Sequence, residues 1–223
     1  VPFRLFLKRE DLHPYGSHKG RSIPHMIDFW ISKGVNRFAI PSSGNAALAA
    51  VLYLKSIATP TELHIYCGLN IAQNKLAKIE KGAEGTDWIR IRKVARPLQE
   101  LSVLLERENS GPDGQIKIAS LRQSTDVEAL RGYNSLTEEL KSIPDLSQIF
   151  IGTSSGTTAT ALAMNLKCSI NIIQTPQCHP IADILGAEVP TLDDQYNDTS
   201  KDVSLADAIV DKVAIRGKNL ANL

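Results

Sequence analysis

Short apolar runs alternate with longer amphipathic stretches along most of the chain. The apolar runs predict strands over residues 1–8, 37–41, 62–67, 86–92, 148–151 and 169–175. The stretches between them repeat apolar residues at helical spacing, which predicts helices over residues 19–33, 45–55, 72–81, 96–108, 127–141 and 155–166. Strands that alternate with helices of about 10–15 residues are typical of parallel βαβ units. The pattern therefore predicts an α/β fold with open parallel sheets.

The length and composition describe a globular chain without a strong charge. The chain has 223 residues, against about 150 for a typical domain, so we expect one large domain or two small ones. Hydrophobic residues make up 43% of it, which excludes a wholly disordered chain. The formal net charge of +1 and the 5% of aromatic residues point to neither a nucleic acid nor a membrane surface as a partner.

The three cysteines, Cys67, Cys168 and Cys178, are far apart in the sequence and favour a reducing compartment. Their odd number and the lack of a C-x-x-C pair argue against a disulfide framework, and no metal site is predicted. The longest apolar run, residues 46–54, is too short to cross a bilayer, and no secretory signal is recognisable. We therefore expect a cytoplasmic protein. Because the chain begins at Val1, inside a predicted strand, we expect a fragment or a trimmed chain.

The first candidate for chemistry is the lysine loop, residues 8–21 (K-R-E-D-L-H-P-Y-G-S-H-K-G-R). Open parallel sheets bind ligands beyond the carboxyl ends of their strands, and this loop follows a predicted strand. Lys19 lies where the loop enters a helix, whose positive end lowers the pKa of an amine. A neutral lysine can attack a carbonyl carbon to form a Schiff base. The alternative is a solvated surface lysine, the usual state of this residue type.

Two further loops contain small and hydroxylated residues between a strand and a helix. The first small-residue loop, residues 41–47 (P-S-S-G-N-A-A), lets a carboxylate or phosphate approach backbone N–H groups. Its alternative is an ordinary helix cap formed by Ser43 or Asn45. The second small-residue loop, residues 152–158 (G-T-S-S-G-T-T), offers donors without bulk and suits a phosphate. It is neither a Walker A loop nor a G-x-G-x-x-G motif, and a plain βα turn is its alternative.

The order of the three loops resembles the fold-type II pyridoxal-phosphate enzymes, the tryptophan synthase β and threonine synthase superfamily. K-R-E-D-L-H-P-Y-G-S-H-K resembles the family's lysine motif, S-S-G-N-A its loop around the cofactor ring, and G-T-S-S-G-T-T its phosphate loop. Residues 74–83 and 129–140 add weaker similarity, so the resemblance spans about residues 5–185. It implies pyridoxal 5′-phosphate as the cofactor and a small amino acid as the substrate.

The resemblance also implies a role for individual residues. Lys19 would bind the cofactor as a Schiff base and then take the α-proton of the substrate, and Asn45 would contact the cofactor ring. His18 would approach the phosphate, with a plain core or surface histidine as the alternative. The substrate carboxylate would lie against Ser42, Ser43, Gly44 and Ala46. The phosphate would lie against Gly152, Thr153, Ser154, Ser155, Gly156 and Thr157.

The implied reaction is that of a lyase or transferase acting at the β or γ carbon of an amino acid. G-S-H-K, residues 16–19, resembles threonine synthases and some tryptophan synthase β chains, and it favours a threonine synthase-like enzyme that converts O-phosphohomoserine to threonine. S-S-G-N, residues 42–45, suits a serine/threonine ammonia-lyase or a cysteine synthase-like enzyme equally well and argues against tryptophan synthase β. A non-catalytic paralogue that acts as a binding protein, or an unrelated phosphate-binding protein, are alternatives of other classes.

The resemblance implies two open parallel-sheet domains with the cofactor in the cleft between them. The small domain is expected over residues 34–121, and the large one over residues 1–33 and 122–223. Both ends of the family fold are expected to be missing, including the segment that faces the pyridine nitrogen. A homodimer is compatible with this interpretation.

Overall fold

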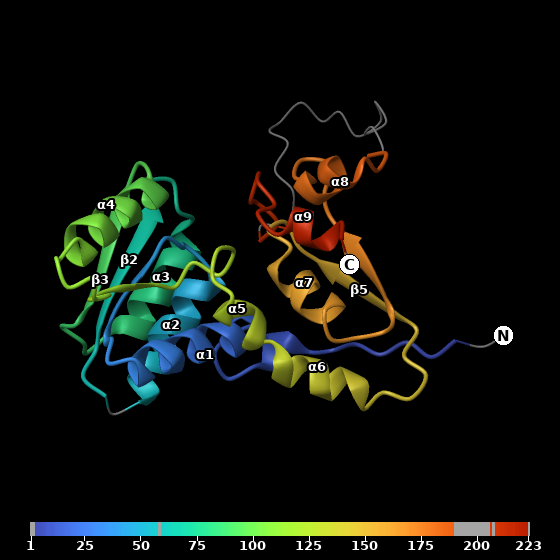
Figure 1. Cartoon of the computed structure of the whole chain (residues 1–223), viewed down its shortest axis with the longest axis horizontal. Helices are drawn as coiled ribbons and strands as arrows, with labels where there is room; N and C mark the ends of the chain where they lie inside the picture. Colours follow the sequence, from blue (N-terminus) through green and yellow to red (C-terminus); the bar gives the residue numbers. More distant parts are fainter. Residues whose placement is uncertain (1–2, 58, 190–205, 207, 223) are drawn as a thin grey trace. The chain divides into compact units, whose positions relative to one another are not determined.

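The computed structural model describes residues 3–57, 59–189, 206 and 208–222. The chain divides into two compact units, Val1–Arg122 and Gln123–Leu223, and each contains its own sheet (Figure 1). All the strand pairs within the two sheets are parallel. The prediction of an α/β fold with open parallel sheets is therefore confirmed.

The sheet of the first unit consists of β1 (Arg37–Ile40), β2 (Glu62–Gly68), β3 (Ile89–Val94) and β4 (Ala119–Ser120). Their order is β3-β2-β1-β4, with β1 and β2 in the middle. The central strands are nearly continuous apolar runs because both of their faces are covered. Since the strands are parallel, the loops that leave β1, β2 and β4 start at one edge of the sheet.

Helices cover both faces of this sheet. α2 (Asn45–Ser56) and α3 (Gln73–Ala83) lie on one face, with α1 (Lys19–Ser32) packed against α2, and α4 (Pro97–Asn109) lies on the other (Figure 1). On the α4 side, the core is formed by Ala39, Tyr66, Leu101, Leu104 and Ile118. A short 3-10 turn, η1 (Glu10–Leu12), precedes α1. The sheet thus holds α1 and α2, the helices that begin at Lys19 and Asn45, on a packed core.

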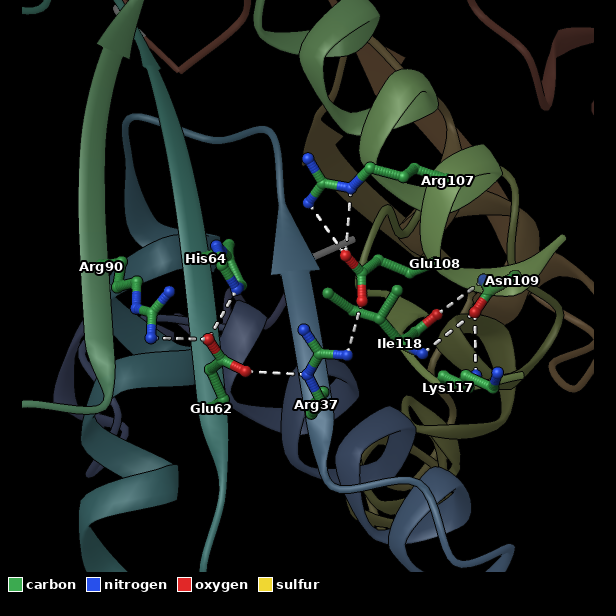
Figure 2. A network of polar contacts seen from close by, with 9 residues as sticks. All are labelled: Arg37, Glu62, His64, Arg90, Arg107, Glu108, Asn109, Lys117 and Ile118. Atoms are coloured by element: carbon green, nitrogen blue, oxygen red, sulfur yellow. Dashed lines mark hydrogen bonds and ion pairs between the residues drawn. The ribbon is translucent and has the colours of Figure 1, made fainter. Parts of the chain in front are cut away.

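A network of ion pairs joins the amino ends of the strands to α4 (Figure 2). Arg37 donates through Nε to Glu62 at 2.8 Å and through Nη1 to Glu108 at 2.8 Å. Glu62 also pairs with His64 Nε2 at 3.0 Å and with Arg90 Nη2 at 3.2 Å. These residues come from β1, β2, β3 and the last turn of α4, so the network ties the amino edge of the sheet together.

Asn109, the last residue of α4, extends this network to the segment before β4 (Figure 2). Its Oδ1 accepts hydrogen bonds from the backbone N–H groups of Lys117 at 2.8 Å and Ile118 at 3.1 Å. Its Nδ2 donates to the carbonyl of Ile118 at 3.0 Å. One side chain therefore satisfies three backbone groups that the two-residue strand β4 leaves without ladder partners.

The second unit is built on the parallel pair β5 (Gln148–Gly152) and β6 (Ser169–Ile173). Its helices are α5 (Glu128–Arg131), α6 (Asn134–Lys141), α7 (Thr157–Ala163), α8 (Pro180–Leu185) and α9 (Gly217–Leu220). Its buried cluster consists of Leu130, Tyr133, Leu136, Leu140, Ala161 and Leu162. α7 packs on β6. The loop between β5 and α7 starts after the last residue of β5, so it lies at the carboxyl end of the parallel pair.

Several predicted elements differ from the structure. The strand expected over residues 1–8 is wrong for its described part, because residues 3–8 have no ladder partner among the described residues. The helix expected over residues 127–141 is divided into α5 and α6, since the buried Tyr133 leaves helical geometry with ψ near 1°. The strand over residues 86–92 begins later, at Ile89. The polar loop over residues 193–201 lies outside the described residues.

The two units differ from the predicted domains in the place of residues 1–33, which here belong to the first unit. The boundary between Arg122 and Gln123 lies one residue from the predicted one. The assignment of the lysine helix to a large domain, which concerns the complete family fold, stays a prediction. Within the part of the chain that the structure describes, no helix is long and apolar enough to span a membrane.

Candidate functional site

Lys19 is the first residue of α1, a helix of 14 residues. Its backbone N–H donates to Ser17 Oγ at 3.2 Å, and the N–H of Gly20 donates to the carbonyl of Ser17 at 2.9 Å. Ser17 is buried and Lys19 is half-buried. No ion pair or hydrogen bond engages the amino group of Lys19 among the described residues. The structure therefore presents an uncommitted amine at the positive end of a helix.

His18 precedes this lysine and is half-buried. Burial and the adjacent Lys19 cation lower the pKa of His18 from 6.5 to about 4, and the Glu10 carboxylate opposes this shift only in part. His18 is therefore neutral at neutral pH. A neutral imidazole can donate one hydrogen bond to an anion without adding a positive charge beside Lys19.

The lysine loop packs along α2. Gly16 has a φ of +83°, and a Cβ at this position would lie 3.3 Å from Leu48 Cδ2, in the first turn of α2. The Tyr15 ring contacts Tyr53 edge-on at 5.5 Å, and its hydroxyl lies 3.4 Å from Ser56 Oγ. The structure thus brings the loop that carries Lys19 to the helix that begins at Asn45.

The first small-residue loop leaves the carboxyl end of β1. Gly44 is the residue before α2, and its N–H donates to Ser42 Oγ at 3.3 Å. No side chain caps α2, and within the described residues neither Ser43 nor Asn45 uses its side chain in a hydrogen bond. The simple capping alternative is therefore wrong for both residues.

The first turn of α2 consequently keeps its donors. Among the described residues, no acceptor is found for the backbone N–H groups of Asn45, Ala46 and Ala47. Asn45 is exposed, and a Cβ at Gly44 would meet nothing within 4 Å. Donors at the start of a helix of 12 residues, next to open space, suit a carboxylate.

The second small-residue loop leaves the carboxyl end of β5 and is held by its own side chains. The N–H of Gly156 donates to Thr153 Oγ1 at 3.1 Å, and the N–H of Thr153 donates to the carbonyl of Ile173 at 3.2 Å. Ser154 Oγ accepts from the N–H of Asp211 at 3.2 Å. These contacts leave the backbone N–H groups of Ser154 and Ser155 without an acceptor in the described part of the chain.

Gly156 in this loop has no room for a side chain. Its φ is +80°, and a Cβ would lie 3.0 Å from Leu220 Cδ1 and 3.4 Å from Arg216 Cβ. Glycine is required there both by the left-handed backbone and by close packing against α9. α7 has only seven residues, so its N-terminus alone is a weak anion site. The donors for an anion are instead the loop's own N–H groups and hydroxyls.

The sequence alone indicates no role for Glu10, His13 or Arg21, although all three lie inside the lysine loop, residues 8–21. The structure places them around the turn that carries Lys19. Their signal in the sequence is only their residue type, since Glu10 and Arg21 lie in two different elements, η1 and α1. No group of three or more His, Cys, Asp or Glu side chains that could hold a metal ion occurs among the described residues.

An uncommitted amine, and separately loops with free N–H donors at the carboxyl ends of parallel strands, are the kinds of group that an anionic carbonyl compound requires. Residues 1–220 match the family model described as pyridoxal-phosphate dependent enzyme, so the chain belongs to this family. The cofactor of the family is pyridoxal 5′-phosphate. The residues present fit it, because an amine suits its aldehyde and backbone N–H groups in a glycine-containing loop suit its phosphate.

Comparison with known proteins gives one curated relative and several solved structures. A stretch of 58 residues is 33% identical to the L-serine dehydratase/L-threonine deaminase of Bos taurus and covers 26% of this chain and 18% of that protein. The fold is similar to a fungal L-serine ammonia-lyase from Rhizomucor miehei, with a TM-score of 0.69 and 16% identity over 96% of this chain and 67% of that one. Serine racemase from Dictyostelium discoideum gives a TM-score of 0.66 and 15% identity, over 94% and 65% of the two chains.

These similarities differ in what they support. The solved structures are below 25% identical, so they support the fold. The matched stretch spans only 18% of the bovine relative. Among the solved structures with a similar fold, this chain spans between 49% and 67% of the other chain's length. The substrate and the reaction of the whole protein are therefore argued as a proposal.

Proposed function

We propose that this chain contributes the catalytic lysine, the substrate-carboxylate site and the cofactor-phosphate site of an enzyme that deaminates a hydroxy amino acid such as L-serine or L-threonine. The observation that carries the proposal is the amine of Lys19, half-buried at the start of α1 and without an ion-pair partner among the described residues, in a chain of the pyridoxal-phosphate family. The similarity of a 58-residue stretch to the bovine dehydratase supports this substrate class.

The residues of the first unit bind and deprotonate the substrate. The N–H groups of Asn45, Ala46 and Ala47, with the hydroxyls of Ser42 and Ser43, hold the α-carboxylate. The Asn45 side chain, which caps nothing, is free to contact the cofactor ring. When bound, pyridoxal phosphate supplies an electron sink for the negative charge that develops at the substrate's α carbon.

Lys19 supplies the base. Its amine accepts the α-proton, and the neutral His18 beside it adds no second cation that would weaken this basicity. In the second unit, the N–H groups of Ser154 and Ser155 and the hydroxyls of Thr153 and Thr157 hold the cofactor phosphate. The net reaction converts L-serine into pyruvate and ammonia, since loss of the β-hydroxyl as water is followed by return of water at the α carbon.

A threonine synthase-like reaction is the second candidate. The run G-S-H-K, residues 16–19, favours it, because this form of the lysine motif resembles threonine synthases. The two reactions differ in the leaving group: hydroxide from the β carbon in one, and phosphate from the γ carbon of O-phosphohomoserine in the other.

The experiment that tests the proposal offers the cofactor-loaded protein L-serine, L-threonine, O-phosphohomoserine and O-acetylserine in parallel. Release of 2-oxo acid from serine or threonine supports the ammonia-lyase, whereas phosphate or acetate release identifies one of the alternatives. If none of the four compounds reacts or changes the visible absorption of the cofactor, the non-catalytic binding protein is the correct interpretation.

Lys19→Ala tests the residue that carries the proposal. We expect the variant to lose the covalent cofactor adduct that borohydride traps, and with it turnover. Lys33→Ala is the matched control, because Lys33 is an exposed lysine at the opposite end of the same helix. A trapped adduct that persists in Lys19→Ala contradicts the assignment.

A further inference from the structure

A buried ion pair closes the lysine loop onto α1. Arg21 donates through Nε and Nη2 to the two carboxylate oxygens of Glu10, at 2.7 Å and 2.8 Å. The side chains are only 8% and 17% exposed, and Lys8 Nζ lies 3.0 Å from the same carboxylate. Such a two-point contact fixes both the distance and the relative orientation of its partners. The residues that it connects, η1 and the first turn of α1, flank Lys19.

A second contact holds the loop from inside. The His13 ring lies directly on the backbone of Gly20, so that a Cβ on Gly20 would be 2.4 Å from His13 Nδ1 and 2.8 Å from Tyr15 Cβ. His13 Nδ1 accepts the N–H of Tyr15 at 3.2 Å, which fixes the ring and leaves its proton on Nε2. Gly20 lies between Lys19 and Arg21, so the ring and the ion pair meet the same turn.

The charge on Glu10 is retained despite its burial. Burial would raise its pKa, but the hydrogen bonds from Arg21 and Lys8 outweigh this and hold the pKa below its ordinary value. The carboxylate is therefore ionised at neutral pH, and its field also reaches His18. The pair is therefore a charged, directional contact at neutral pH.

We infer that Glu10, His13 and Arg21 are positioning residues that set the direction in which the Lys19 amine leaves α1. The inference rests on the proposed function of Lys19. The geometry supports it because the Glu10–Arg21 ion pair and the His13 ring on Gly20 both hold the turn that follows Lys19, whereas no contact of its own fixes the Lys19 side chain among the described residues. A reacting group held by its neighbours in this way needs no contact that would occupy its amine.

A purely structural ion pair makes a different prediction from a positioning pair. Replacing both charges of a buried pair by neutral side chains of similar size removes the penalty of desolvation, and such replacements are often neutral for stability. The double variant Glu10→Gln/Arg21→Met should then fold normally. Because a glutamine and a methionine make no two-point contact, only the positioning role would be lost.

The test measures how fast cofactor-free protein reacts with added pyridoxal phosphate. The amine condenses with the aldehyde and releases one water, which the visible absorption follows. Borohydride then reduces the bond and peptide mapping identifies the labelled lysine. Wild type is compared with Glu10→Gln, Arg21→Lys, the double variant and Gly20→Ala, with thermal denaturation of each. Arg9→Gln/Asp11→Asn is the matched control, since this neighbouring ion pair is 53% and 62% exposed.

We expect the double variant to melt near the wild-type temperature and yet to react about tenfold to a hundredfold more slowly at Lys19, whereas the exposed-pair control changes less than about twofold. Arg21→Lys keeps the positive charge but loses the two-point contact, so its reaction rate should lie between those of wild type and the double variant. If the double variant recovers both stability and rate, the pair is only structural and the inference is wrong. If wild type is labelled at a residue other than Lys19, the proposed function fails and the inference with it.

Discussion

The low pKa of His18 makes the stability of the first unit depend on pH between about 4 and 6.5, a range whose upper part lies above the ordinary pKa of carboxylates. The unfolded chain binds a proton at His18 below its ordinary pKa of 6.5, whereas the folded chain does so only near 4. Between these values the unfolded state holds more protons, so the free energy of unfolding falls as the pH falls from 6.5 to 4. The full shift corresponds to about 3 kcal/mol, of which about 2 kcal/mol is lost between pH 7 and pH 5.

Urea denaturation followed by tryptophan fluorescence measures this effect in the correct unit, because Trp30 and Trp88 both belong to the first unit. We expect His18→Gln to remove about 2 kcal/mol of the stability loss between pH 7 and pH 5. His64, whose pKa burial also lowers, accounts for part of what remains. His179→Gln is the control, since His179 belongs to the second unit.

An NMR titration tests the lowered pKa of His18 directly. The His18 ring should titrate near pH 4 in the NMR spectrum of the cofactor-free protein. A midpoint near 6.5, or a pH dependence that His18→Gln leaves unchanged, would refute the reasoning. Cofactor binding extends the test: if the phosphate lies against His18, its negative charge must raise the pKa, and an unmoved midpoint places the phosphate elsewhere.

Three further substitutions test the loops and the ion-pair network. Gly156→Asp should lower cofactor affinity at least about tenfold, because its Cβ would lie 3.0 Å from Leu220 Cδ1 and would force the second small-residue loop to shift. Gly186→Asp has a similar positive φ but open space around its Cβ, so it should leave the affinity unchanged; equal effects in a binding titration would point to backbone strain alone. Asn45→Ala should leave the melting temperature and cofactor affinity nearly unchanged but slow turnover; unfolding with intact specific activity would contradict this. Glu62→Gln should lower the free energy of unfolding by about 1–2 kcal/mol at pH 7, as measured by urea denaturation. Because the pKa of Glu62 is lowered in the folded protein, this difference from wild type should shrink as the pH falls below about 4.5; a difference independent of pH would refute its electrostatic origin.

The sequence predicts the regular part of the fold well because its signals are local. Gly34 ends the first helix pattern, and the continuous apolar run of β2 is typical of a strand covered on both faces. The residues where the prediction fails depend on distant contacts. β4 has only two residues and exists through its pairing with β1, and the break at Tyr133 follows from burial of that ring in the second unit.

The candidate site divides in the same way. Lys19 and the two small-residue loops are contiguous motifs, so residue type and position between a strand and a helix are enough to find them. The contacts of Glu10 with Arg21 and of His13 with Gly20 span seven to eleven residues of irregular loop. No periodicity marks such pairs, so they become visible only when the chain is folded.

The ion-pair network of Figure 2 lies at the end of the sheet opposite the first small-residue loop. Its residues occupy the amino ends of β1 and β2, while the first small-residue loop starts beyond the carboxyl end of β1, about four strand residues or roughly 13 Å away. Changes at Arg37, Glu62 or Glu108 therefore alter stability at the end of the sheet opposite the proposed carboxylate site. Selection for heat tolerance can change the residues at this end without changing the first small-residue loop.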